Sequence, residues 1–146
     1  MPHEEYEILI VEDNPHDAEL MLRSLQKNHL ANNIIVLEDG EKALDFIFCR
    51  ESFANRDMLR PPKVIFLDLK LPKLNGLEVL KEIKEDPNTK KIPVVIITSS
   101  REDPDIHTAY ELGANSYVVK PVDFSDFMET MTDLGSYWIA VNEGFR

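Results

Sequence analysis

The sequence is poor in the features that accompany secretion or membrane insertion. Cys49 is the single cysteine, so no internal disulfide can form. The opening residues MPHEEYEILI carry acids where a secretory signal carries Lys or Arg, and no apolar run approaches the roughly 20 residues that span a bilayer. We therefore expect a cytoplasmic protein without a membrane segment.

Basic residues are scarce beside acidic ones. The chain has 16 Lys and Arg against 27 Asp and Glu, which gives a formal net charge of -11. This charge would repel a phosphate backbone, and no local cluster of Lys and Arg overrides it. We therefore predict no direct binding to nucleic acid. The four histidines lack a paired spacing such as H-x-x-x-H, so zinc binding is not predicted either.

The apolar residues, 43% of the 146, are enough for one continuous core in a single domain that spans residues 1–146. Short runs rich in Val and Ile predict buried strands at 6–11, 34–37, 64–67, 94–97 and 117–119, with helical spacing between them. Apolar strands joined by helical crossovers indicate a doubly wound α/β fold with a parallel sheet. We predict the flavodoxin-like strand order 2-1-3-4-5 with helices on both faces.

Capping residues mark three helix starts. Asn14–Pro15 and Asp103–Pro104 each place a cap residue before a proline at the first helical position. Asp123 marks another start, with Val122 placed to pack against Phe127.

The connection at residues 50–62, RESFANRDMLRPP, is long for a link between a helix and a strand. It could extend the second helix, contact a partner or form a plain surface insertion. Its composition favours the surface insertion.

Acidic residues stand where two predicted strands end. Glu12 and Asp13 follow the first strand, and Asp68 follows the third. These strands are neighbours in the predicted order, about 4.8 Å apart, so the carboxylates crowd together. Like charges at that spacing destabilise a fold unless a cation binds between them, and oxygen ligands favour Mg²⁺. Helix capping is the alternative for Asp13, but it does not account for Asp68.

The other strand ends add hydroxyl groups and an ammonium group. Thr98 and Ser99 follow the fourth strand, and Lys120 follows the fifth. Each is unremarkable alone, because a Thr at a strand end is usually structural and a Lys is usually solvated. A phosphorylated carboxylate needs a metal, a cation and a hydroxyl donor around its charged oxygens. Together these residues predict a site that accepts a phosphoryl group on Asp68.

The sequence resembles the receiver domain of two-component response regulators over nearly its whole length. The resemblance rests on Glu12–Asp13, Asp68, Thr98 and Lys120–Pro121, in that order, and on the spacing from Asp68 to Gly76 in DLKLPKLNG. It implies that Asp68 takes a phosphoryl group from a phosphohistidine of a sensor histidine kinase. The protein would then be a phosphoacceptor that signals, not an enzyme that turns over a substrate.

The resemblance also implies a metal site. Asp13 and Asp68 would bind Mg²⁺ directly, and Glu12 would bind it through water. The backbone carbonyl of Lys70 would complete the protein ligands. Glu12 replaces the Asp that is more frequent in the family. Lys70 and Ser100 occupy positions that tune dephosphorylation in the family, which leaves the lifetime of the phosphorylated state open.

The remaining site residues would bind the phosphoryl group and report its presence. By the resemblance, Thr98 and Lys120 would each bind a phosphoryl oxygen, and Tyr117 would swing inward as Thr98 moves. Ser99 stands where a smaller residue is common. The Lys120–Pro121 bond would be cis, which X-Pro chemistry permits at small cost.

Three other functions compete with this interpretation. A haloacid-dehalogenase-type phosphatase needs a second Asp where this chain has Lys70, which cannot protonate a leaving group near neutral pH. A flavodoxin-like FMN site would bring phosphate against Glu12–Asp13, which would repel it. An interaction scaffold that no longer accepts phosphate is a third alternative, against which the complete set of site residues argues.

The partners are less visible in the sequence. We expect a stand-alone regulator that acts through protein contacts. The 50–62 segment and Ser136–Tyr137–Trp138 resemble the corresponding parts of regulators that pair with bacterial phytochrome kinases.

A helical stripe predicts core residues at the end of the chain, namely Phe124, Phe127, Met128, Met131, Leu134 and Trp138. Tyr137, Val141 and Phe145 fall outside it and predict a homodimer or partner surface with the fourth helix and fifth strand, although a loosely folded tail is equally consistent.

Overall fold

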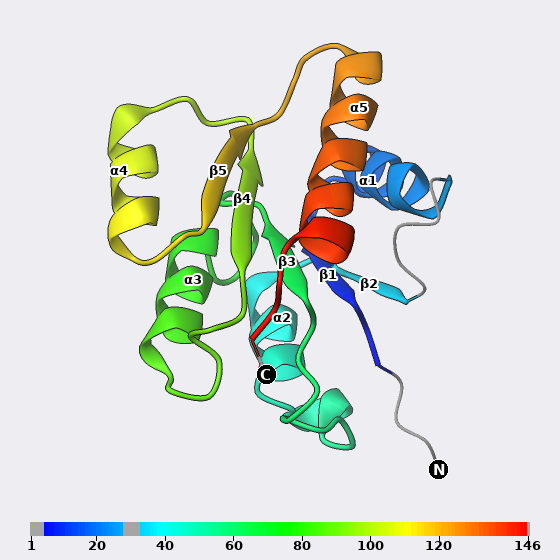
Figure 1. Cartoon of the computed structure of the whole chain (residues 1–146). Coiled ribbons are helices and arrows are strands. Elements are labelled where there is room, and N and C mark those ends of the chain that lie inside the picture. Colours follow the sequence, from blue (N-terminus) through cyan, green and yellow to red (C-terminus); the bar gives the residue numbers. More distant parts are fainter. Residues whose placement is uncertain (1–4, 28–32, 146) are drawn as a thin grey trace.

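The computed structural model describes residues 5–27 and 33–145, in which a 5-stranded parallel sheet has the order β2-β1-β3-β4-β5 (Figure 1). The strands are β1 (Ile8–Val11), β2 (Ile34–Leu37), β3 (Val64–Leu67), β4 (Val94–Thr98) and β5 (Ser116–Val119). The predicted fold class and strand order are confirmed. The predicted strands differ from the observed ones by two residues at most, at the start of β1.

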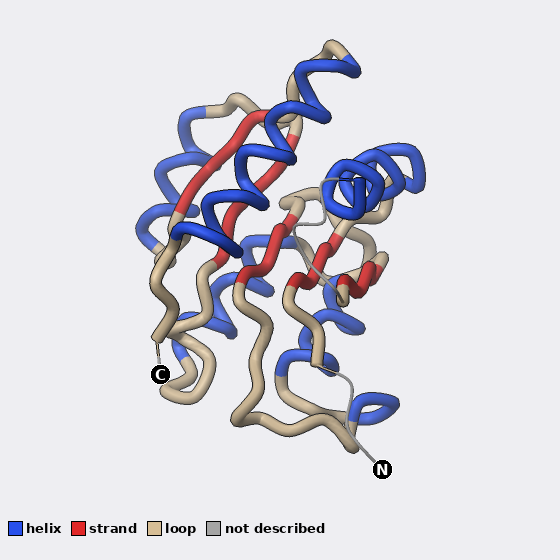
Figure 2. The backbone as a smooth tube through the Cα atoms, turned by 45° about the vertical axis from the view of Figure 1, so that its right-hand side comes forward, coloured by secondary structure: helices blue, strands red, loops and turns tan. Residues whose placement is uncertain are grey.

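Helices cover both faces of this sheet (Figures 1 and 2). They are α1 (Pro15–Lys27), α2 (Gly40–Ile47), α3 (Gly76–Glu85), α4 (Asp103–Glu111) and α5 (Phe124–Gly135). The first and last helices, α1 and α5, pack side by side on one face, and α2, α3 and α4 cover the other.

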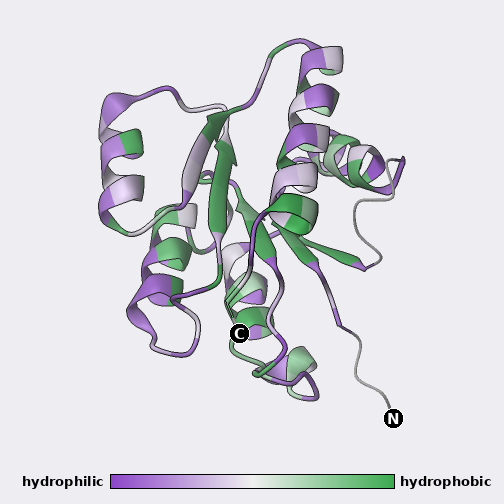
Figure 3. Cartoon of the chain, viewed as in Figure 1, coloured by the Kyte–Doolittle hydropathy of each residue, from purple (hydrophilic) through white to green (hydrophobic). Residues whose placement is uncertain are grey.

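The core has two layers because side chains alternate along each strand. Ile8 and Ile10 of β1 face the layer under α1 and α5, where they meet Met21 and Met131. Leu9 of β1 faces the opposite layer, as do its neighbours on β3 and the buried side chains of α2 and α3. The central strands are therefore apolar throughout, as the green arrows of Figure 3 show.

Two of the predicted helix caps are present. The side chain of Asn14 accepts hydrogen bonds from the backbone N–H groups of the first turn of α1, and Asp123 does the same for α5. The third prediction is wrong by one residue, since α4 begins at Asp103 itself, after Glu102. The contact predicted for Val122 is also wrong, because Val122 is 99% exposed.

Residues 50–62 do not extend the second helix. Helix α2 ends at Ile47, and a short 3₁₀ turn, η1 (Glu51–Phe53), follows. The guanidinium carbon of Arg56 lies 3.7 Å from the centroid of the Phe46 ring, and Arg56 also donates a hydrogen bond to the Phe46 carbonyl oxygen. The segment is thus fixed to the core by one arginine that stacks on an aromatic ring.

The last helix continues into a π-helical turn, η2 (Ser136–Val141). Phe127, Met131 and Trp138 are buried against the sheet as the helical stripe predicts. Phe124 is not, with 58% of its surface exposed, because the first turn of α5 extends beyond the ends of the strands (Figure 1). Within the described residues, every helix is too short or too polar to cross a membrane.

Candidate functional site

Side chains from four strand ends meet at the carboxyl edge of the sheet. Glu12 follows β1, Asp68 follows β3, Thr98 ends β4 and Lys120 follows β5. Because parallel strands end at the same edge, residues more than a hundred positions apart lie in contact here. The fold therefore brings together the acids, the hydroxyl and the ammonium group that the sequence predicts.

Lys120 is the centre of this group. Its Nζ atom lies 2.6 Å from Oε1 of Glu12 and 2.9 Å from Oδ2 of Asp68. A third carboxylate, that of Asp17, lies 2.8 Å from the same nitrogen. Lys120 donates hydrogen bonds to Asp68 and Asp17, whereas its contact with Glu12 is an ion pair without hydrogen-bond geometry. In the structure, Lys120 is the counter-ion of this acidic site.

Glu12, Asp13 and Asp68 form a cluster with the chemistry of a metal site. One carboxylate oxygen of each lies within 4.8 Å of the others. Glu12 and Asp68 are buried, whereas Asp13 is exposed, so the cluster opens to solvent on one side. Hard oxygen donors with one open side suit Mg²⁺, which keeps several of its own waters. The residues present fit the metal that the sequence predicts.

Burial and charge give these groups different affinities for protons. Burial raises the pKa of Glu12 to about 7, against the opposing effect of the Lys120 ammonium and with a contribution from the Asp68 charge. Burial acts on Asp68 in the same direction, but Lys120 and the Thr98 hydroxyl hold its pKa below the ordinary value. Burial disfavours the charged form of Lys120, but its carboxylate partners raise its pKa above the ordinary value. Asp68 is therefore ionised near neutral pH, as a nucleophile must be.

The hydroxyl groups after β4 have different positions. Thr98 is fully buried, and its hydroxyl helps to lower the pKa of Asp68, whereas Ser99 is exposed. Ser100, which the resemblance places at a position that tunes dephosphorylation, donates a 2.6 Å hydrogen bond to Asp105 of α4. The Tyr117 hydroxyl donates a 3.0 Å hydrogen bond to the carbonyl oxygen of Ser100. The loop after Thr98 is therefore linked to both α4 and β5.

The prediction of a cis bond is wrong, because no peptide bond in the described residues is cis and Lys120–Pro121 is therefore trans. Trans is the favoured isomer of X-Pro bonds, and from it the Lys120 side chain already reaches the carboxylates. Lys70 contributes a backbone N–H that donates to Oδ1 of Asp68 at 3.2 Å. Metal binding by the Lys70 carbonyl stays a prediction.

Asp17 is the site residue that the sequence analysis missed. It lies in the first turn of α1, where an acid is common because it offsets the helix dipole. The position of Asp17 in the sequence could have indicated its role. Helix α1 begins directly after Glu12 and Asp13, so its first turn must lie at the carboxyl edge of the sheet. Its partner, Lys120, is 103 residues away in sequence, and no local pattern could indicate it.

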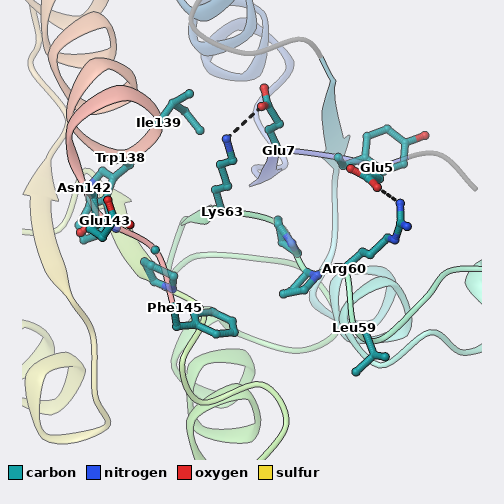
Figure 4. Close-up of a pocket in the computed structure, with 15 residues that line it drawn as sticks. Glu5, Glu7, Leu59, Arg60, Lys63, Trp138, Ile139, Asn142, Glu143 and Phe145 are labelled. Atoms are coloured by element: carbon teal, nitrogen blue, oxygen red, sulfur yellow. Dashed lines mark hydrogen bonds and ion pairs between the residues drawn. The ribbon is translucent and has the colours of Figure 1, made fainter.

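A larger cavity lies at the opposite, amino edge of the sheet (Figure 4). It has a volume of about 580 Å³, and residues 142–145 line one side of it. Its basic side chains already have acidic partners, because Arg60 pairs with Glu5 and Lys63 with Glu7. It shares no residue with the acidic site, so it takes no part in the chemistry described above.

Comparison with known proteins agrees with this geometry. A family model described as the response regulator receiver domain matches residues 8–132. The probable methanogenesis regulatory protein FilR2 of Methanothrix harundinacea is 38% identical over 92% of this chain and 84% of its own length. Response regulator Rcp1 of Synechocystis is 36% identical over 90% of this chain and 88% of its own. The chain belongs to the response regulator receiver domain family.

Solved structures give the same result. The Mn²⁺-bound form of response regulator Rcp1 matches with a TM-score of 0.90 at 34% identity, over 98% of this chain and 100% of its own. The phosphorylated cyanobacterial phytochrome response regulator RcpA matches with a TM-score of 0.90 at 31% identity and the same coverage. The bacteriophytochrome response regulator AtBRR is 48% identical over 97% of this chain and 100% of its own, with a TM-score of 0.73. The chain is thus similar to response regulators that are named for phytochrome signalling, RcpA and AtBRR among them.

Proposed function

We propose that this protein accepts a phosphoryl group on Asp68 from a phosphohistidine of a sensor histidine kinase and signals in its phosphorylated form. The observation that carries the proposal is the contact of a buried, ionised Asp68 with the Lys120 ammonium beside an acidic cluster suited to Mg²⁺. Receiver domains typically act as phosphoacceptors, and the similar protein RcpA was crystallised in phosphorylated form.

Each site residue has a separate role in the phosphoryl transfer. An oxygen of Asp68 attacks phosphorus while the bond from phosphorus to the histidine nitrogen breaks, and that nitrogen keeps the electron pair. Lys120 neutralises charge on the incoming phosphoryl oxygens, and the buried Thr98 hydroxyl donates to one of them. Mg²⁺ held by Glu12, Asp13 and Asp68 would supply further neutralisation of those oxygens.

The signal leaves the site through the loop after β4. When Thr98 turns toward a phosphoryl oxygen, the loop that follows must move with it. Ser100 in that loop is hydrogen bonded to Asp105 of α4 and to Tyr117 of β5. Phosphorylation would thus shift the population of two arrangements of α4 and β5, because the two differ in their contacts with the phosphoryl group.

The partner proposed for Asp68 is a sensor kinase of the bacterial phytochrome type. Support comes from the similarity to RcpA and AtBRR, which are named as phytochrome response regulators, and the similarity to FilR2 leaves other kinases open. The protein would act as a stand-alone regulator through protein contacts. A phosphotransfer screen against purified kinases identifies the donor, and a phytochrome kinase that transfers more slowly than unrelated kinases would contradict this assignment.

A small-molecule test separates this function from its rivals. Incubation with acetyl phosphate and Mg²⁺ should give an adduct on Asp68 that hydroxylamine removes. Asp68→Asn should abolish the adduct, whereas Asp133→Asn, which alters an exposed acid of α5, should not. An adduct on the Asp68→Asn variant would refute the assignment. Steady release of phosphate would favour a phosphatase, and an absence of reaction in the wild type would favour the interaction scaffold.

A further inference from the structure

Asp17 contacts the site without belonging to the acidic cluster. Its Oδ2 atom lies 2.8 Å from Nζ of Lys120, and 26% of its side-chain surface is exposed. The metal-type cluster comprises Glu12, Asp13 and Asp68 and does not include Asp17. Among the three acids on the ammonium, Asp17 is thus the one with no place among the predicted metal ligands.

The position of Asp17 outside this cluster matters when a divalent cation occupies the site. Lys120 shares Glu12 and Asp68 with the position that a divalent cation would occupy. A cation there would draw the two carboxylates toward itself and repel the ammonium at close range. Asp17 would then be the carboxylate that stays available to Lys120, and its charge would offset the repulsion between the two cations.

We propose that Asp17 is a positioning residue that holds Lys120 at the edge of the site, so that the ammonium neither leaves nor competes for the metal position. This inference rests on the proposed function and deepens it. Asp17 is outside the Glu12, Asp13 and Asp68 cluster that would bind the metal, and it would act through Lys120 alone. The backbone of Asp17 is held in the first turn of α1, because its N–H donates a 3.1 Å hydrogen bond to the Asn14 side chain.

A purely structural role makes a different prediction. Acids in the first turn stabilise a helix through its dipole, and that effect needs no contact with Lys120. Glu19 lies on the same helix, is exposed and pairs with Arg23 at 2.8 Å, so Glu19→Gln removes the same charge without touching Lys120. Asp17→Glu keeps the charge on a longer side chain.

The test measures Mg²⁺ affinity by calorimetry and the rate of adduct formation with acetyl phosphate. Asp17→Asn should weaken Mg²⁺ binding about three- to tenfold, because Lys120 then pairs more closely with the metal ligands. The adduct should form more slowly at saturating Mg²⁺. Asp17→Glu should restore much of both properties, and Glu19→Gln should match the wild type.

A double-mutant cycle with Lys120→Met decides whether Asp17 acts through Lys120. The loss of Mg²⁺ affinity on Asp17→Asn should shrink in the Lys120→Met background. A loss that persists undiminished would mean that Asp17 acts by its charge alone and would overturn the inference, as would Asp17→Asn binding Mg²⁺ like Glu19→Gln. If the wild type itself binds no Mg²⁺ and forms no adduct, the proposed function fails first, which keeps the two failures distinct.

Discussion

Gly76, the first residue of α3, lies against the backbone of Asp68. A Cβ atom at position 76 would come 2.2 Å from the Asp68 carbonyl oxygen and 2.6 Å from Cα of Leu69. The Gly76 N–H also donates to the Leu69 carbonyl oxygen at 2.9 Å. The absence of a side chain therefore lets α3 begin directly behind the proposed phosphoacceptor and hold its backbone in place.

Gly76→Ala should accordingly destabilise the fold and disturb the site. The backbone atoms it would meet cannot rotate away, so we expect a cost of about 1–3 kcal/mol in urea unfolding. Phosphorylation by acetyl phosphate should slow as Asp68 is displaced. Gly144→Ala is the matched control, since nothing lies within 4 Å of a Cβ there, and it should change stability by less than about 0.5 kcal/mol. Equal effects of the two substitutions would contradict the role of Gly76.

Removing the counter-ion should expose the repulsion between the acids. Lys120→Met leaves Glu12 and Asp68 buried without their shared cation, so we expect a loss of about 2–3 kcal/mol in metal-free urea unfolding. Mg²⁺ should recover much of this loss. Lys73→Met serves as the control, because Lys73 is mostly exposed and lies 3.7 Å from its partner Asp39. A Lys120→Met variant as stable as Lys73→Met would show that the ammonium is not needed to balance the acids.

Mg²⁺ itself should stabilise the wild type. A ligand that binds only the folded protein adds RT ln(1 + [L]/Kd), or about 2.7 kcal/mol at a hundredfold excess over Kd. Asp13 is exposed, so Asp13→Asn should leave metal-free stability nearly unchanged while it removes most of the effect of Mg²⁺. Asp133→Asn should keep that effect. A wild-type melting temperature that does not respond to millimolar Mg²⁺ would argue against the metal site.

The raised pKa of Glu12 predicts a pH dependence. The Glu12 pKa is about 7 in the folded protein, against 4.5 as its ordinary value. Between these values the folded state holds a proton that the unfolded state has lost. The stabilisation is therefore complete below the ordinary value and is lost as pH rises through the folded pKa, by at most about 3 kcal/mol. Without Mg²⁺, urea unfolding from pH 5 to 7.5 should show this decline in the wild type and a flatter curve in Glu12→Gln. Curves that decline equally would rule out Glu12 as the source.

The sequence predicts the sheet and the strand-end residues well because both depend on local signals. Apolar runs mark the strands, and Glu12, Asp68 and Lys120 follow directly where those runs stop. Once the strand order is inferred, their convergence follows from parallel pairing. Asn14 and Asp123 are predicted correctly for the same reason, since a cap acts on residues two or three positions away.

The exposure of Phe124, the isomer of the Lys120–Pro121 bond and the contact of Asp17 depend on features that no local signal decides. Phe124 fits the helical stripe, but its exposure depends on how far α5 extends beyond the strands. The Lys120–Pro121 isomers differ by roughly 1 kcal/mol, so tertiary contacts choose between them. Asp17 pairs across 103 positions, and only the folded chain brings it to Lys120.

The exposed residues after α5 lead to the last prediction, which concerns self-association. Tyr137, Val141 and Phe145 are 49%, 66% and 46% exposed, as their position outside the helical stripe predicts. The Tyr137 ring packs edge-on against Trp138 with centroids 5.0 Å apart, so it is held in place at the surface. Fixed exposed aromatic residues are typical of interfaces.

Tyr137→Ala should therefore weaken a homodimer or partner complex more than it weakens the fold, because about half of the side chain already contacts solvent. Sedimentation of the wild type and the variant, each with and without beryllofluoride and Mg²⁺, measures this directly. We expect the phosphoryl mimic to increase association in the wild type, since the hydrogen bond from Tyr117 to Ser100 links β5 to the loop that is proposed to respond to phosphorylation of Asp68. Leu59→Ala removes an apolar side chain that is 88% exposed in the 50–62 segment, and it should behave as the wild type. A wild type that stays monomeric in every condition, together with unchanged kinase binding by Tyr137→Ala, would mean that these residues cover the domain as a loosely packed tail and form no interface.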